Sequence, residues 1–176
     1  MKVAIIGAGN MGGAIARGMA TGSIIKAEEI VVTAHTQATL DKLKTDIPAI
    51  NTTLNNREAA EGANIIMLCI KPWLVQPVLE EIYPAINQSN PMIVNVAAGI
   101  SFEQISTMMA GDIRPVARVI PNTAIAIKMS PTLMCFNEAM SEAQQQQIND
   151  EGWSFLQLND RIITGGRNLY EGKTIG

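Results

Sequence analysis

A glycine-rich stretch near the N-terminus has the residue types and spacing of a phosphate-binding turn. Residues 7–12 read Gly-Ala-Gly-Asn-Met-Gly, directly after a short β-rich run and at the start of a segment with helical spacing. In this pattern Gly7 permits a tight turn, Gly9 lets the backbone approach a pyrophosphate, and Gly12 lets the helix pack against the strand. The turn is expected to leave amide hydrogens free for a diphosphate at the positive end of the helix dipole. The alternative is a glycine-rich turn in another α/β protein.

The segment after the second predicted strand bears on which dinucleotide would bind. A site for NAD usually has an acidic residue about 20 positions after the glycines, where it holds the ribose 2′-hydroxyl. Residues 32–37 read Val-Thr-Ala-His-Thr-Gln, and no acid occurs before Asp41. Thr33, His35 and Thr36 could donate hydrogen bonds to a 2′-phosphate instead. The pattern favours NADPH and leaves NADH possible, while His35 could equally be an exposed loop residue.

Three further segments follow predicted strands, at the edge of a parallel sheet where ligands bind. They are Lys71-Pro72, the small residues 97–99 and the segment 121–123. Small residues would let a flat nicotinamide ring lie close to the backbone. Each segment could be ordinary loop chemistry, but their shared placement at strand ends favours a site.

The sequence contains no convincing catalytic triad, metal cluster or pair of carboxylates. His35 is the only histidine, which excludes a His-rich metal site, and no catalytic residue is assigned. Hydride transfer requires none of these groups, because the cofactor supplies the chemistry and the protein supplies position and electrostatics.

The elements that would position these residues alternate between β-rich runs and helical spacing. Such alternation implies right-handed βαβ units and predicts an α/β fold, a doubly wound, mostly parallel Rossmann sheet with helices on both faces. Residues 65–70 and 92–96 are nearly all apolar, as in central strands covered on both faces. The predicted strands are Val3–Ile6, Ile30–Thr33, Ile65–Ile70, Met92–Val96, Val116–Ile120 and Thr132–Phe136. Helices are expected around Leu40–Ile47, over Trp73–Asn87, from a Ser101 cap to Met109, and over Ser141–Leu158.

The composition excludes several classes of protein. Hydrophobic residues make up 47% and charged residues 16% of the 176 residues, which is unlike a disordered chain. A net charge of -3 lacks the basic character of nucleic-acid-binding or polybasic membrane-binding proteins. No apolar run reaches the roughly 18–20 residues of a membrane span. Cys69 and Cys135 lie in apolar stretches and are expected to be reduced core thiols, so a cytoplasmic protein is predicted.

Five motifs, in this order, resemble the pyrroline-5-carboxylate reductase family, which performs the last step of proline synthesis. The resemblance extends from residue 1 to about residue 158. The glycine motif is shared by many reductases, whereas the ordered set Lys-Pro, Ala-Ala-Gly and Arg-Val-x-Pro-Asn-Thr is far more specific. The motifs occupy residues 1–12, 55–58, 69–72, 95–100 and 118–123.

The resemblance implies roles for individual residues. His35 and Thr36 would lie near the 2′-phosphate, Asn56 would contact the adenosine side, and Asn122 would sit beside the substrate cleft. Hydride would move from the nicotinamide to the C=N carbon of a cyclic imine, and no strong base is required because the protonated imine is the better electrophile. The pyrophosphate residues would be Gly7, Ala8, Gly9, Asn10, Met11 and Gly12, and the nicotinamide would be lined by Ile70, Lys71, Pro72, Ala97, Ala98 and Gly99.

The sequence departs from the family in two respects. Ile120 and Ala124 replace the methionine and the second proline of the family's Met-Pro-Asn-Thr-Pro. The family also continues into an all-helical domain that makes the dimer and completes the site. We expect that domain to be absent here, with residues 1–158 as an NADP-binding domain and 159–176 as a tail unlike the family. Such a chain would bind dinucleotide, reduce the imine poorly or not at all, and form a homo-oligomer through an exposed apolar surface.

Two other kinds of protein remain alternatives. One is another Rossmann reductase, related to 3-hydroxyacid dehydrogenases or deazaflavin-linked NADP reductases, which share the glycine start but differ after residue 70. The other is a non-catalytic dinucleotide-binding fragment, for which tight NADPH binding without turnover would be diagnostic.

Overall fold

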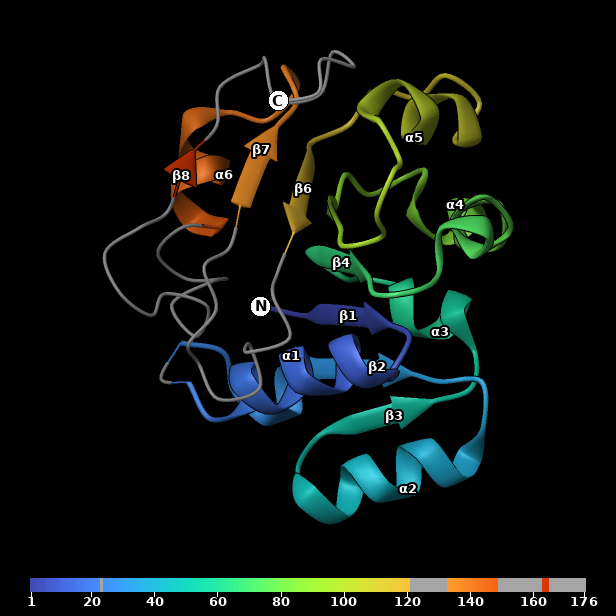
Figure 1. Cartoon of the computed structure of the whole chain (residues 1–176), viewed down its shortest axis with the longest axis vertical. Helices are drawn as coiled ribbons and strands as arrows, with labels where there is room; N and C mark the ends of the chain where they lie inside the picture. Colours follow the sequence, from blue (N-terminus) through green and yellow to red (C-terminus); the bar gives the residue numbers. More distant parts are fainter. Residues whose placement is uncertain (23, 121–132, 149–162, 165–176) are drawn as a thin grey trace, which may run out of the picture.

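The described strands of the chain form one twisted sheet in the computed structural model (Figure 1), which describes residues 1–22, 24–120, 133–148 and 163–164. The strand order is β3-β2-β1-β4-β5-β6-β7-β8. The first six strands are parallel, β7 runs antiparallel to β6, and β8 is parallel to β7. The strands are β1 Val3–Ile6, β2 Ile30–Thr33, β3 Asn51–Thr53, β4 Ile65–Leu68, β5 Met92–Asn95, β6 Val116–Ile120, β7 Leu133–Phe136 and β8 Ile163–Thr164.

Helices cover both faces of the sheet, which confirms the predicted doubly wound α/β fold. Strand residues alternate between two apolar cores: Val3 and Ile5 join the core with α1 and α2, whereas Ala4 and Ile6 join the core with α3, α4 and α5. This two-sided burial explains why the central strands are apolar at every position. The helices are α1 Asn10–Ala20, α2 Gln37–Asp46, α3 Asn56–Ala60, α4 Val75–Ile86, α5 Phe102–Met108 and α6 Glu142–Gln147. None of the described helices is long and apolar enough to span a membrane.

Local signals in the sequence place several of these helices correctly. The stripe predicted over residues 73–87 is the buried face of α4, where Val78, Ile82 and Ile86 pack into the core. Ser101 caps α5 as predicted: its Oγ accepts the amide of Gln104 at 3.1 Å, and Gln104 Oε1 accepts the amide of Ser101 at 2.8 Å. The single turn Pro72–Leu74 before α4 is a 3-10 helix rather than part of the α-helix.

Two strands are absent from the sequence-based prediction. β3 reads Asn-Thr-Thr and lies at the outer edge of the sheet, so it needs no apolar face and carries no hydrophobic alternation. β8 is two residues long and falls after residue 158, where no element was predicted. The first part of the last predicted helix, Ser141–Leu158, is found as α6, and the part from residue 149 lies outside the described residues. The boundary between residues 158 and 159 stays a prediction.

The two cysteines are free, but neither is fully inside the core. Cys69 and Cys135 are both half-buried as whole residues, but the thiol of Cys69 is buried against the core as predicted, whereas that of Cys135 is only partly covered. Cys69 follows β4 and packs at the margin of the core that contains α1. Burial raises the pKa of the Cys69 thiol to about 12 and also raises the pKa of Cys135. Both thiols are therefore protonated at neutral pH.

The sheet order creates a crevice between β1 and β4. The chain leaves β1 towards β2 on one side and, after β3, returns to β4 on the other, so the two connections diverge at this point. In open α/β sheets such a switch point, at the carboxyl ends of the strands, is where ligands bind. Here the crevice brings the turn after Ile6 beside the segment after Leu68, and the amide of Cys69 donates to the carbonyl of Ile6 at 2.9 Å.

Candidate functional site

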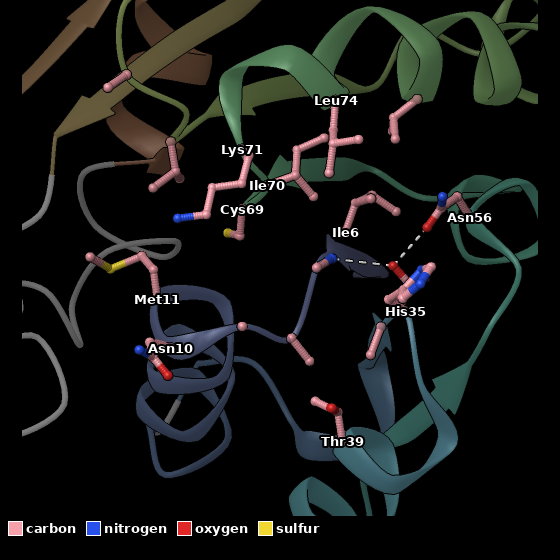
Figure 2. Close-up of a pocket in the computed structure, with 18 of the residues that line it drawn as sticks. Ile6, Asn10, Met11, His35, Thr39, Asn56, Cys69, Ile70, Lys71 and Leu74 are labelled. Carbon is pink, nitrogen blue, oxygen red and sulfur yellow. Dashed lines mark hydrogen bonds between the residues drawn. The ribbon is translucent and has the colours of Figure 1, made fainter.

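A cleft of about 1000 Å³ lies at the switch point, and most of the residues singled out in the sequence line it. His35 and Asn56 lie at one end of the cleft, and Lys71 and Met11 lie at the other (Figure 2). The lining thus joins the segments that follow β1, β2, β3, β4 and β5, which are far apart in the chain. The predicted site residues that line it are Gly7, Ala8, Gly9, Asn10, Met11, His35, Asn56, Ile70, Lys71, Ala98 and Gly99.

The glycine turn is shaped by close contacts at Gly7 and Gly12. Gly7 has a φ of +101°, and a Cβ there would lie 2.8 Å from the carbonyl oxygen of Cys69. A Cβ at Gly12 would lie only 1.9 Å from the carbonyl oxygen of Gly7. Gly12 is buried and does not line the cleft, so its contribution is to let α1 approach the turn closely. By contrast, a Cβ at Gly9 would meet no atom of the described residues within 4 Å.

The amides of the turn divide into two groups. The amides of Gly7 and Ala8 donate to the carbonyl oxygen of Thr33, at 3.2 and 2.7 Å. The expectation of free amides throughout the turn is therefore wrong for these two residues, because the end of β2 already accepts them. The amides of residues 9–12 have no acceptor within the described residues, since the first helical bond of α1 is from Gly13 to Gly9. Of this second group, Gly9, Asn10 and Met11 line the cleft, so an anion there would meet their amides.

Thr33 also uses its hydroxyl within the protein. Its Oγ1 accepts the amide of Gly7 at 3.2 Å and donates to Oδ1 of Asn56 at 2.8 Å (Figure 2). The carboxamide oxygen only accepts, so the hydroxyl proton of Thr33 must point at Asn56. The expectation that Thr33 donates to a 2′-phosphate is therefore wrong. Asn56 Nδ2 in turn donates to Glu81 Oε2 at 2.9 Å, which orients its carboxamide at the edge of the cleft.

The end of the cleft near α2 carries hydroxyl and imidazole groups. His35 is exposed and lines the cleft, so it is both a loop residue and a candidate ligand. Thr36 is exposed but does not line the cleft; its Oγ1 lies 2.9 Å from Oγ1 of Thr39, which does. Thr39, four residues after His35, is thus a site candidate that the sequence did not single out.

The charges of the cleft suit an anion. No Asp or Glu is among the lining residues, and the first turn of α1 has no acidic residue. Lys71 is the one Lys or Arg in the lining, and within the described part of the chain its ammonium has no ion pair. The positive end of the α1 dipole adds to the same field. Among the described residues, no three His, Cys, Asp or Glu side chains are grouped as a metal site would require.

The segments after β4 and β5 form the other wall of the cleft. Lys71 is exposed and begins the 3-10 turn, and Pro72 occupies the first position of that turn rather than the lining. Ala97 is buried in the core and also does not line the cleft, whereas Ala98 and Gly99 are exposed to it. Asn122 lies outside the described residues.

Apolar side chains complete the cleft, and most were not predicted as site residues. Leu74 and Val78 come from the turn before α4 and from α4 itself, where the sequence signal was a core stripe. Leu54 and Ile120 are 53% and 40% exposed, and no pattern in the sequence separates them from core residues. The remaining unpredicted lining residues are Ile6, Ala34, Cys69 and Val96.

A parallel sheet with this strand order, and a glycine turn at its switch point, define a Rossmann-type nucleotide-binding domain of the oxidoreductase class. Residues 2–99 match the model of the family described as "NADP oxidoreductase coenzyme F420-dependent". The chain belongs to this family, and the relatives that match its sequence confirm the resemblance to pyrroline-5-carboxylate reductases.

The alignments with those relatives cover most of this chain but only part of each relative's length. Pyrroline-5-carboxylate reductase 1 of Dictyostelium discoideum is 31% identical over 161 residues, covering 92% of this chain and 28% of the relative. The Escherichia coli enzyme is 32% identical, covering 74% of this chain and 48% of the relative. The structure of the Coxiella burnetii reductase matches with a TM-score of 0.78 and 26% identity, over 88% of this chain and 55% of that one. The chain thus spans about half the length of the Escherichia coli and Coxiella burnetii relatives and less than a third of the Dictyostelium discoideum relative.

Proposed function

We propose that the chain carries the cofactor-binding half of an NADPH-dependent reductase that converts 1-pyrroline-5-carboxylate to L-proline. One observation carries the proposal: Gly9, Asn10 and Met11 at the N-terminus of α1, whose amides have no acceptor among the described residues, line a cleft whose described lining contains no carboxylate. The names of the relatives supply the substrate, because nothing in the described cleft alone selects a cyclic imine.

The residues of the cleft fit a dinucleotide. A pyrophosphate needs close backbone approach. At Gly9 a Cβ would meet no atom of the described residues within 4 Å, so packing among those residues does not require glycine there. The N–H groups of Gly9, Asn10 and Met11 and the charge of Lys71 would hold the phosphates. His35 and Thr39, with no acid beside them, would accommodate a 2′-phosphate better than a free 2′-hydroxyl, which favours NADPH over NADH.

When bound, the nicotinamide supplies the hydride, and the chain's residues orient and enclose it. Ile70, Ala98 and Gly99 would form the wall against which a flat ring packs. Lys71 would attract the carboxylate of an anionic substrate as well as the phosphates. Because a protonated imine is itself a good electrophile, none of these residues has to act as a strong base.

The family description raises a second candidate, a reductase linked to a deazaflavin coenzyme, since the matching family is described as coenzyme F420-dependent. This candidate shares the NADPH site and differs in the hydride acceptor. The curated relatives at about 30% identity are named pyrroline-5-carboxylate reductases, which favours the imine.

Calorimetric titration with NADPH and NADH, followed by turnover assays with 1-pyrroline-5-carboxylate and with coenzyme F420, tests the proposal. We expect NADPH to bind more tightly than NADH, and any turnover, which should be poor, to occur with the imine and not with coenzyme F420. Binding without turnover of either acceptor would make the chain a dinucleotide-binding module, and no binding of either nucleotide would overturn the proposal. Light scattering in the same samples tests the predicted homo-oligomer.

A further inference from the structure

Asn95, the last residue of β5, uses its whole carboxamide to hold one backbone unit. Its Nδ2 donates to the carbonyl oxygen of Ala97 at 3.0 Å, and its Oδ1 accepts the amide of Ala97 at 3.1 Å. Both groups are buried, and Asn95 is only 1% exposed. The orientation of the carboxamide is fixed, because a backbone N–H only donates and a carbonyl only accepts.

This double hydrogen bond occupies the backbone groups of Ala97 and of no other residue of the loop. The N–H and C=O of Ala97 are both hydrogen-bonded to Asn95, and Ala97 is buried. The next two residues, Ala98 and Gly99, are exposed, line the cleft, and have no backbone hydrogen bond within the described residues. Gly99 has a φ of +74°, so the chain turns back sharply there towards α5.

We propose that Asn95 is a positioning residue for the nicotinamide end of the cofactor. By closing the bonds to Ala97, it holds the turn of residues 97–99 so that the free amides of Ala98 and Gly99 face the cleft before any ligand binds. A planar ring with a carboxamide needs such backbone partners on a flat wall, and a turn already fixed avoids the cost of ordering it on binding. The inference rests on the proposed function, since it requires a dinucleotide in the cleft.

Asn137 offers a matched control at the opposite ends of the strands, away from the cleft. Its Oδ1 accepts the amide of Val116 at 2.9 Å, and its Nδ2 donates to the carbonyl oxygen of Arg114 at 2.8 Å. These bonds lie at the start of β6, opposite the strand ends that form the cleft. Removing either Asn carboxamide therefore leaves one N–H and one C=O without their partner, but only Asn95 is connected to the cleft.

The test compares Asn95→Ala, Asn95→Ser and Asn137→Ala in the full chain. Binding is measured by calorimetry with two probes, NADP⁺ and adenosine 2′,5′-bisphosphate, which lacks the nicotinamide. We expect Asn95→Ala to weaken NADP⁺ by about tenfold and the bisphosphate by less than about twofold, because only the nicotinamide end depends on the turn. The serine hydroxyl can restore one of the two bonds, so Asn95→Ser should recover part of the loss. Asn137→Ala should leave both affinities unchanged.

Thermal unfolding of each variant separates positioning from loss of fold. If Asn95→Ala does not fold, Asn95→Ser is compared with the wild type using the same two probes. Equal weakening of both probes, no weakening of NADP⁺, or the same weakening in Asn137→Ala would overturn the role of Asn95 while leaving the proposed function in place. A wild-type chain that binds neither probe would instead overturn the proposed function, and the role of Asn95 with it.

Discussion

The hydroxyl of Thr33 lies between the amide of Gly7 and the carboxamide of Asn56, at 3.2 and 2.8 Å. One buried side chain at the end of β2 thus joins the glycine turn to the start of α3. Both joined residues line the cleft, so the shape of the cleft depends on the hydroxyl of a threonine that is itself only 2% exposed.

Replacing Thr33 by valine should weaken both the fold and the site. Valine keeps the branched shape and strand preference of threonine but leaves Oδ1 of Asn56 without its donor, which should cost about 1–3 kcal/mol of unfolding free energy. Affinity for NADPH should fall at the same time, because Asn56 loses its fixed orientation. Urea denaturation and NADPH titration measure the two effects. Thr33→Ser keeps the hydroxyl and is the control; a valine variant as stable as the serine variant would contradict the argument.

The glycines at positions 9 and 12 should respond to substitution in opposite ways. Gly9 has a φ of -68° and open space at its Cβ position, so Gly9→Val should fold with near-normal stability and lose NADPH binding. Gly12→Ala places a Cβ 1.9 Å from the carbonyl oxygen of Gly7, so it should destabilise the fold by about 1–3 kcal/mol or more. Circular dichroism melts and NADPH titration distinguish the two. Undiminished binding in Gly9→Val would remove the phosphate role from the turn.

An acid at the end of β2 should change the cofactor preference. His35→Asp places a carboxylate in the cleft where the described lining has none, and it would repel a 2′-phosphate while accepting a hydrogen bond from a 2′-hydroxyl. We expect the affinity for NADPH to fall about tenfold and the affinity for NADH to stay equal or rise. His35→Asn, which adds no charge, is the control. An equal change in the affinities for NADPH and NADH would show that the ribose 2′-position does not lie beside residue 35.

The stability of the protein should fall at alkaline pH because of Cys69. Burial raises the pKa of the folded thiol from 9.0 to about 12, so above pH 9 the unfolded chain releases a proton that the folded chain retains. The stabilisation is complete below pH 9 and is lost as pH rises towards 12, at up to about 1.4 kcal/mol per pH unit. Urea denaturation at pH 8, 9 and 10 measures this, with Cys69→Ala as the comparison. A wild type and variant with parallel pH dependence would show that the Cys69 thiol is not buried.

Several parts of the fold follow from local sequence because the forces are local. Ser101 and Gln104 form a capping box from two residues three positions apart. The stripe of Val78, Ile82 and Ile86 repeats with the period of a helix and needs only an apolar neighbour. The glycine turn was predicted for the same reason, since a positive φ at residue 7 and a close approach at residue 12 restrict the residue type directly.

The sequence by itself determined an alternation of buried strands and amphipathic helices, a glycine turn at the first strand end, and an acid-free second strand end. Only the tertiary structure decided that the hydroxyl of Thr33 donates to Asn56 and that the amides of Gly7 and Ala8 donate to the end of β2. It also decided which loop residues meet across the cleft. The physical reason is separation along the chain. Hydrogen bonds between residues 7, 33 and 56 exist only after parallel strands align their ends, and residue types alone do not record which donor finds which acceptor.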